Sequence, residues 1–200
     1  MKKILFSCLM LAACLCVQAQ TTTQILDRAA AVVGRSGGCS AAFTLSHPQT
    51  GKATGNIQIK GQKFHAVLGE MEVWFNGKTQ WVYQASTEEV SISNPSAVGR
   101  QQMNPYTFIS LYKRGYNAKH VSRAGYYIVT LTPQKNTKPT LGVITLTIRK
   151  KDCVPTEIRF HQNGQPVTIR INSLQAKNQP DGLFQFNPKK YPNAEIIDLR

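Results

Sequence analysis

The feature that most limits the possible folds of this chain is a predicted hairpin over residues 71–83. Both faces of this hairpin are apolar. It contains Asn76-Gly77 between two β-forming runs, and a type I′ turn needs the positive φ angles that these two residue types tolerate. With these two residues as the whole loop, Phe75 would pair with Lys78, and side chains would alternate between two faces. One face would carry Trp74, Trp81 and Tyr83, and the other Met71, Val73, Phe75 and Val82. An antiparallel sheet ordinarily has one polar face, so we expect another part of the chain to cover the second apolar face.

The first residues predict export. Two lysines, an apolar run from Ile4 to Val17 and the small residue Ala19 are typical of a secretory signal, which we place at residues 1–19. The sequence Leu11-Ala12-Ala13-Cys14 also fits the site at which bacterial lipoproteins are cleaved and acylated, so a lipid anchor at Cys14 is the alternative. Residues 20–200 are expected to form a single domain, large enough to bury about two-thirds of the surface of its unfolded chain.

The chain is strongly basic, with a formal net charge of +14 that includes two lysines of the predicted signal. Inside a cell such a charge would favour nucleic acid, but export makes that partner unexpected. The basic residues are scattered, with short clusters at Arg149-Lys150-Lys151 and Lys189-Lys190. A solvated basic surface explains this pattern, and attraction to acidic membranes or acidic proteins is the alternative.

The sequence gives little support for catalysis, a metal or a cofactor. Residues 34–38 match the G-x-S-x-G nucleophile pattern, but that chemistry needs a strand before the serine, and a helical pattern precedes Ser36. The four histidines lack the spacing of metal ligands. Cys39 and Cys153 lie outside the signal, and an oxidising compartment leaves open whether they form a disulfide. We therefore expect a binding protein without a cofactor, not an enzyme.

Hydrophobic periodicity predicts two helices among many short strands. The residues at helical spacing in the first helix, over 23–33, are Ile25, Leu26, Ala29, Val32 and Val33. A second helix, over 102–115, is apolar around most of its circumference and must therefore be buried or cover an apolar surface. A pattern of period two begins at Cys39, and later strands are expected at 126–132, 141–148, 155–161, 167–171, 183–186 and 194–199.

These elements predict an α+β fold. The expected architecture is an incomplete, unclosed antiparallel β-barrel of about ten strands, with a helical lid on the concave side. Such a lid would cover the second apolar face and enclose an apolar cavity.

The order of the segments carries a resemblance to a known family. The relevant segments are CSAAFTL from Cys39, GNIQIK from Gly55, KFH from Lys63, NGKTQWVY from Asn76, NPYTFI from Asn104, YIVTLTP from Tyr127 and LFQFNP from Leu183. Together they cover essentially the whole mature chain and resemble the periplasmic lipoprotein carrier family, LolA, with the NGKTQWVY hairpin as the most specific element. The resemblance implies a carrier of acylated lipoproteins, which it takes from an inner-membrane ABC-type release complex and passes to an outer-membrane acceptor or membrane. We expect a monomer, and the alternative is an envelope sensor that binds lipid or lipoprotein on the same fold without transport.

Candidate acyl-binding residues follow from the two apolar patterns and the resemblance. They are Phe64, Leu68, Val73, Phe75, Trp81 and Val82 on the wall, with Met103 and Phe108 on the lid. Phe64 matches an aromatic residue near the mouth of the family's cavity. The family's arginine after the lysine of the second strand is absent from Lys60-Gly61-Gln62-Lys63, so control of the lid is expected to differ. Both faces of the hairpin are apolar, and either face is therefore a candidate for the cavity wall.

Overall fold

The computed structural model describes residues 20–96, 105–135 and 141–200. Its helices are α1 (Thr22–Val33), α3 (Pro105–Ser110) and the short 3₁₀ helices η1 (Leu111–Lys113), η2 (Asp181–Phe184) and η3 (Pro188–Lys190). Its strands are β1 (Cys39–His47), β2 (Gly51–Lys60), β3 (Lys63–Leu68), β4 (Met71–Phe75), β5 (Gln80–Gln84), β6 (Glu89–Ser93), β7 (Tyr116–Arg123), β8 (Tyr126–Pro133), β9 (Ile144–Arg149), β10 (Pro155–Gln162), β11 (Gln165–Ala176) and β12 (Glu195–Asp198). The predicted lid residue Met103 lies outside the described residues.

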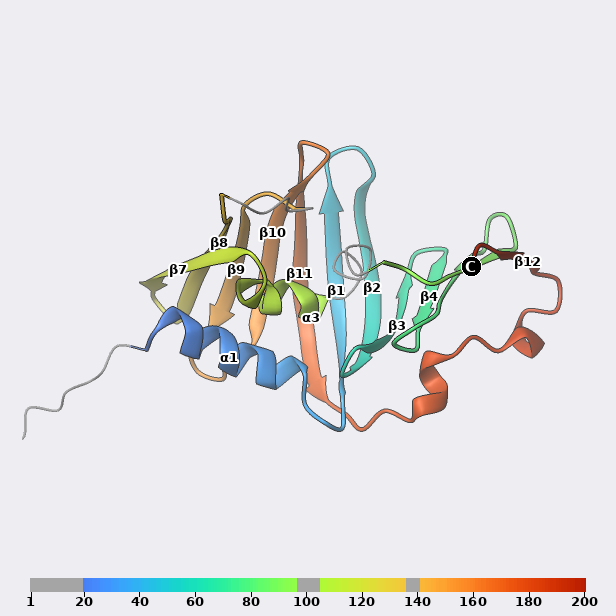
Figure 1. Ribbon diagram of the computed structural model, residues 1–200, viewed down its shortest axis with the longest axis horizontal. Helices are drawn as coiled ribbons and strands as arrows, with labels where there is room; N and C mark the ends of the chain where they lie inside the picture. Colours follow the sequence, from blue (N-terminus) through green and yellow to red (C-terminus); the bar gives the residue numbers. More distant parts are fainter. Residues whose placement is uncertain (1–19, 97–104, 136–140) are drawn as a thin grey trace, which may run out of the picture.

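The strands form one curved, unclosed sheet. Their order is β12-β6-β5-β4-β3-β2-β1-β11-β10-β9-β8-β7, so β12 and β7 are its two edges (Figure 1). Neighbours are antiparallel except for β12, which pairs with β6 in parallel through Glu195–Asp198. The predicted open, curved sheet is confirmed, with twelve strands in place of about ten and with one parallel pair.

Two segments differ from the sequence prediction. Residues 116–123 form the edge strand β7, which sequence patterning did not reveal because most of its side chains are polar. Residues 183–186 were predicted as a strand, but Leu183 and Phe184 end the helix η2. Phe184 is completely buried and Phe186 is nearly so. Two buried aromatic side chains, and not the hydrogen bonds of a strand pair, therefore hold this segment against the protein.

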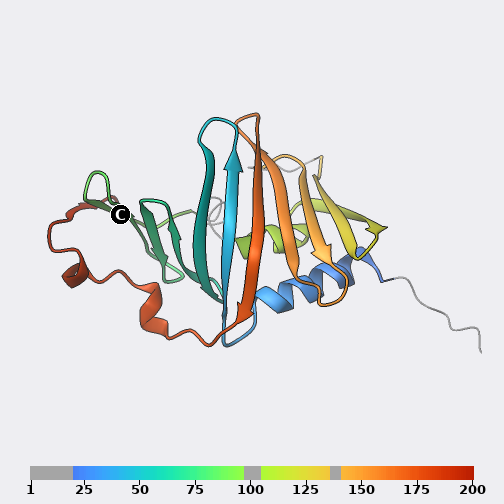
Figure 2. The ribbon, with the colours of Figure 1, turned by 180° about the vertical axis from the view of Figure 1, so that it is seen from behind.

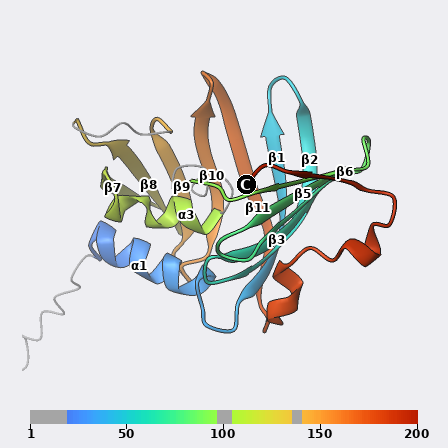
Figure 3. The same ribbon diagram turned by 45° about the vertical axis from the view of Figure 1, so that its right-hand side comes forward.

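Helix α1 begins where its sequence predicts. The Thr21 hydroxyl accepts a hydrogen bond from the Gln24 backbone N–H, and the Gln24 side chain accepts one from the Thr21 N–H, which satisfies two otherwise unpaired donors. Its apolar residues Ile25, Leu26, Ala29 and Val33 are buried. They share one hydrophobic cluster with residues of α3 and the sheet. Figures 1 and 2 show α1 and α3 on the same side of the sheet, and Figure 3 shows them within its curve.

The hairpin between β4 and β5 has a different register from the predicted one. Trp74 pairs with Trp81, and Phe75 pairs with Gln80 in place of Lys78. The Asn76 Oδ1 atom accepts hydrogen bonds from the backbone N–H groups of Lys78 and Thr79, at 3.0 and 2.9 Å, so Asn76 caps the loop instead of forming its centre. The shift is two residues, and the predicted division of side chains between the two faces is therefore retained.

The C-terminal segment covers the aromatic face of this hairpin. Trp74 contacts the rings of Phe186 and Tyr191 edge-on, at centroid distances of 5.3 and 5.6 Å. The residues of this outer cluster are Trp74, Val90 and Phe186, with Trp81, Tyr83, Ile92, Tyr191 and Ala194 packed against them. The Tyr191 hydroxyl donates to a Glu72 carboxylate oxygen at 2.6 Å, and the other oxygen of Glu72 lies 2.6 Å from the His65 ring. One of the two apolar faces is thus buried by the end of the chain.

We expect Phe186→Ala to lower the free energy of unfolding by about 3 kcal/mol, because it removes a buried ring beside Trp74. Chemical denaturation followed by tryptophan fluorescence measures this change. Leu199→Ala is the matched control in the same segment, since Leu199 is 65% exposed and its loss should alter stability by less than about 0.5 kcal/mol. Equal effects of the two substitutions would contradict the assigned anchor.

Candidate functional site

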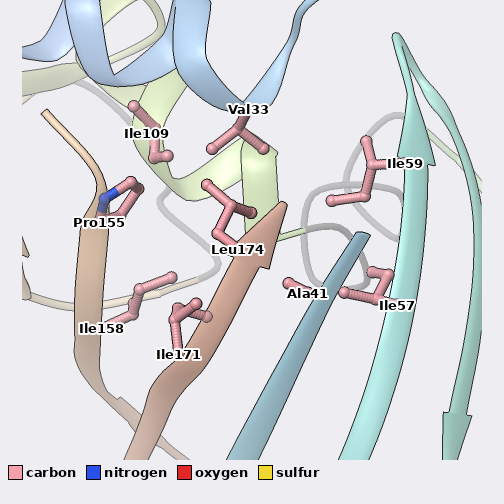
Figure 4. A pocket seen from close by; sticks show the side chains of 9 residues that line it. All are labelled: Val33, Ala41, Ile57, Ile59, Ile109, Pro155, Ile158, Ile171 and Leu174. Carbon is pink, nitrogen blue, oxygen red and sulfur yellow. The ribbon is translucent and has the colours of Figure 1, made fainter. Parts of the chain in front are cut away.

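The concave side of the sheet and its two helices enclose an apolar interior. Phe108 of α3 lies against Phe160 of β10, with ring centroids 5.1 Å apart, and both Phe108 and Ile109 are 1% exposed. The remaining space beside them is a cavity of about 30 Å³ (Figure 4). Its lining residues are Val33, Ala41, Ile57, Ile59, Ile109, Pro155, Ile158, Ile171 and Leu174. This volume is small, so the described residues of the two helices and the sheet pack closely around the cavity.

The structure brings most of the predicted wall residues to this concave side. Phe64, Val73 and Phe75 are buried in the same cluster as Phe108, and Val82 packs against that cluster. Phe64 and Phe75 pair across β3 and β4 with ring centroids 5.6 Å apart. These residues therefore share one continuous apolar surface with α1 and α3.

Two further predicted residues are placed by strand register. Leu68 is half-buried and pairs with Met71, which puts it on the concave face two positions beyond Ala66. Trp81 pairs with Trp74 and belongs to the outer cluster beneath the C-terminal segment. Trp81 consequently lies on the opposite face of the sheet from Val73 and Phe75.

Sequence reasoning named none of the nine residues that line the cavity as acyl-binding residues. Seven of them come from β1, β2, β10 and β11, which are far apart in the chain but adjacent in the sheet. Their period-two pattern was visible, yet no single-sequence signal placed Ala41 beside Ile57 and both near Ile158. Strand pairing supplies this information, because β1 lies between β2 and β11.

Polar side-chain contacts link α1 to η1 and to β7. The Tyr112 hydroxyl donates to Asp27 Oδ1, and Lys113 Nζ lies 3.0 Å from the same oxygen. The hydrogen bond from Tyr112, followed by that from Lys113, lowers the pKa of Asp27 below its ordinary value of 3.8. At the other end of α1, Thr22 Oγ1 lies 2.8 Å from the His120 ring in β7. These polar contacts are mostly solvent-exposed, so they orient the helix more than they bind it.

The turn at Lys60-Gly61-Gln62-Lys63 binds the C-terminal segment. Lys63 and Lys60 lie 2.9 and 3.2 Å from Asp181 Oδ1, and Lys60 also donates to the Gln179 carbonyl oxygen at 3.2 Å. Where the resemblance implies an arginine that holds the lid, this chain therefore has lysines that fasten the end of the chain to β2 and β3.

Cys39 and Cys153 are free, buried thiols. The Cys39 thiol donates to the Val33 carbonyl oxygen at 3.4 Å, and burial raises its pKa to about 11. A thiol with so high a pKa is a poor nucleophile. The two cysteines belong to the hydrophobic cluster, and the structure contains no disulfide between them.

Within the described ranges, no helix is long and apolar enough to cross a membrane. The same part of the chain contains no group of three His, Cys, Asp or Glu residues that could hold a metal ion.

Comparison with known proteins relates these features to a family. Residues 12–165 match the family described as outer membrane lipoprotein carrier protein LolA. Among curated proteins, none matches the sequence. The fold is similar to that of an uncharacterized conserved protein from Thermus thermophilus, with a TM-score of 0.59 and 15% identity over 90% of this chain and 99% of the other. At this identity the similarity supports the fold alone.

Two other solved structures are also similar. One is a LolA superfamily protein from Nitrosomonas europaea, with a TM-score of 0.47, 14% identity and coverage of 84% of this chain and 99% of that protein. The other is a putative outer membrane lipoprotein-sorting protein domain from Vibrio parahaemolyticus, with a TM-score of 0.44, 10% identity and coverage of 83% and 97%.

The Asp27 contacts predict an acid-sensitive helix pair. The pKa of Asp27 is lowered in the folded state, so its ionised form adds stability above pH 3.8, and this contribution is lost as the pH falls through the folded pKa. Protection of α3 and η1 amides, measured by hydrogen exchange corrected for intrinsic rates, should therefore fall between about pH 5 and about pH 3. Asp27→Asn should show lower protection at the higher pH and a smaller change on acidification.

Asp198→Asn is the control for this experiment. Arg200 lowers the pKa of Asp198 to about 2, but Asp198 is the last residue of β12 and Arg200 follows it, at the C-terminal end of the chain. This variant should leave α3 protection unchanged at either pH. Identical exchange in wild type and Asp27→Asn would show that the Asp27 contacts do not hold the helices.

Proposed function

This chain belongs to the LolA family of outer membrane lipoprotein carrier proteins, and we propose that it is a periplasmic carrier that shields the acyl chains of lipoproteins between the inner and outer membranes. The observation that carries the proposal is the continuous apolar concave face that shares one hydrophobic cluster with α1 and α3. The signal over residues 1–19 would direct the chain to the periplasm. Acylated lipoproteins, an ABC-type release complex and an outer-membrane acceptor are the proposed partners.

The small cavity beneath the helices shapes the proposed mechanism. Its volume of about 30 Å³ is too small for an acyl chain, so the proposed loading step has α1 and α3 move as a lid. Acyl methylenes gain about 0.8 kcal/mol each on burial. They would replace side chains such as Phe108 and Ile109, which bury comparable apolar surface against the same sheet. Because one apolar contact substitutes for another, the net free energy is a small difference, and both loading and release stay possible.

Individual residues have distinct parts in this mechanism. Phe64, Val73, Phe75 and Val82 supply the proposed wall, with Leu68 at its border. Phe108 is the proposed lid residue, since its ring lies directly on the sheet residue Phe160. Trp81 supports the wall from behind by packing under the C-terminal segment. No covalent step is involved, because shielding requires contact and release only.

Substitutions on the two faces of β3 test the proposal. Phe64 is 3% exposed on the concave face, whereas Val67 is 36% exposed on the other face of the same strand. We expect Phe64→Glu to reduce extraction of a triacylated lipoprotein from liposomes by at least about tenfold, because a carboxylate opposes acyl burial. Phe64→Leu should retain most of the activity, and Val67→Glu should extract as well as wild type.

The assay also separates transport from sensing. A carrier must both extract the lipoprotein and release it to acceptor liposomes, while a sensor of the same fold would bind without release. Circular dichroism of each variant establishes that it is folded. Wild-type extraction by folded Phe64→Glu would contradict the assigned wall, and binding without release by wild type would contradict the carrier function.

A further inference from the structure

A second, open pocket lies at the end of the sheet where two hairpins turn. It has a volume of about 490 Å³. The β1–β2 and β10–β11 turns lie side by side there, at the end of the sheet away from α1 (Figures 1 and 2). The residues that line this hairpin-end pocket are Leu45, His47, Gln49, Thr50, Phe160, Gln162, Asn163, Gln165, Val167 and Ile169.

The floor of the hairpin-end pocket is apolar and belongs to the concave face. Leu45 of β1 pairs with Ile169 of β11, and Phe160 of β10 pairs with Val167 of β11, so the four side chains form one patch across three strands. Phe160, Val167 and Ile169 are 8%, 2% and 9% exposed, which makes this floor part of the packed sheet.

The floor continues toward the closed cavity under the helices. Ile158 and Ile171 line that cavity, and each lies two residues along its strand from a floor residue of the hairpin-end pocket. Phe160 of this floor packs against Phe108 of α3. Among the described residues, the hairpin-end pocket is open with the helices in their present position.

The described rim of the hairpin-end pocket is polar and contains no acidic residue, lysine or arginine. It consists of the amides Gln49, Gln162, Asn163 and Gln165, the hydroxyl of Thr50 and the ring of His47. The Nδ1 atom of His47 accepts a hydrogen bond from the Gln49 backbone N–H at 3.2 Å. Although the chain has a net charge of +14, none of the described residues that line this opening is a lysine, arginine, aspartate or glutamate.

Tight turns hold the rim in place. Asn163 and Gly164 have φ angles of +51° and +77°, and Gln162 pairs with Gln165 on either side of them, as in a two-residue type I′ hairpin. The neighbouring β1–β2 hairpin closes with His47 opposite Gly51. Hydrogen-bonding groups on such short turns are pre-positioned and lose little conformational freedom on binding.

We propose that the hairpin-end pocket binds a single alkyl chain of an amphiphile whose head group is uncharged and carries hydroxyl or ester groups. The volume lies within the range of pockets that hold small molecules. The apolar floor would take the chain, and the amides and hydroxyl of the rim would bond to the head group. A charged head group would give up hydration here without an opposite charge to compensate it. This site does not depend on helix movement or on the carrier function.

Binding of three amphiphiles with the same ten-carbon chain tests this proposal. The probes are decyl maltoside, decyl sulfate and decyltrimethylammonium, each below its critical micelle concentration and measured by titration calorimetry with the full mature chain. Leu45→Trp fills the pocket, and we expect it to weaken decyl maltoside binding by about tenfold. Ser46→Trp is the matched control, since Ser46 is the next residue of β1 and faces the other side of the sheet.

Two additional variants keep the result interpretable. Val167→Phe fills the same floor with a smaller change and should also weaken decyl maltoside binding, with folding verified by circular dichroism. Gln162→Lys places a cation on the rim and should shift the preference toward decyl sulfate. The proposal is overturned if wild type does not bind decyl maltoside, if folded Leu45→Trp and Val167→Phe bind it as well as wild type, or if the charged probes show the same dependence on Leu45.

Discussion

The hairpin of β4 and β5 is apolar on both faces, and the rest of the structure depends on how these faces are covered. The outer face carries Trp74 and Trp81, and the C-terminal segment covers it. That segment is fixed by backbone pairing of β12 with β6, by ion pairs from Lys60 and Lys63, and by the hydrogen bond from Tyr191 to Glu72. The inner face meets α1 and α3, which contribute side chains but no strand pairing. The C-terminal segment is therefore joined to the sheet by strand pairing, whereas α1 and α3 contact the sheet through side chains only.

The proposed working cycle rests on this difference between the two covers. A sheet with a permanently supported back keeps its curvature when its front is exposed, because the Trp74 cluster and the paired edge do not involve the helices. The helices are held mainly by apolar contact and by exposed polar pairs such as Asp27 with Lys113. Apolar contact is non-directional, so in the proposed cycle acyl chains take the place of Phe108 and its neighbours. The small cavity beside Ile109 marks where the packing is already incomplete.

Sequence patterning predicted the faces of the sheet better than its connections. The β4–β5 register was wrong by two residues because Asn76 caps its loop, whereas the type I′ geometry occurs at Asn163-Gly164. An error of two residues leaves every side chain on its predicted face, and Val73 and Phe75 were therefore grouped correctly. The cover over Trp81 was not predictable in the same way. It depends on isolated anchors, Phe184 and Phe186, in a segment without regular periodicity.

The distance between α3 and the sheet tests the central claim most directly. Spin labels at Thr107 of α3 and Arg159 of β10, in a chain with Cys39 and Cys153 replaced by alanine, report this distance by pulsed electron paramagnetic resonance. Addition of a synthetic triacylated lipopeptide should convert a single short distance into a longer one, in proportion to the lipopeptide bound. A distance distribution that stays unchanged while the lipopeptide binds would contradict an acyl site beneath movable helices.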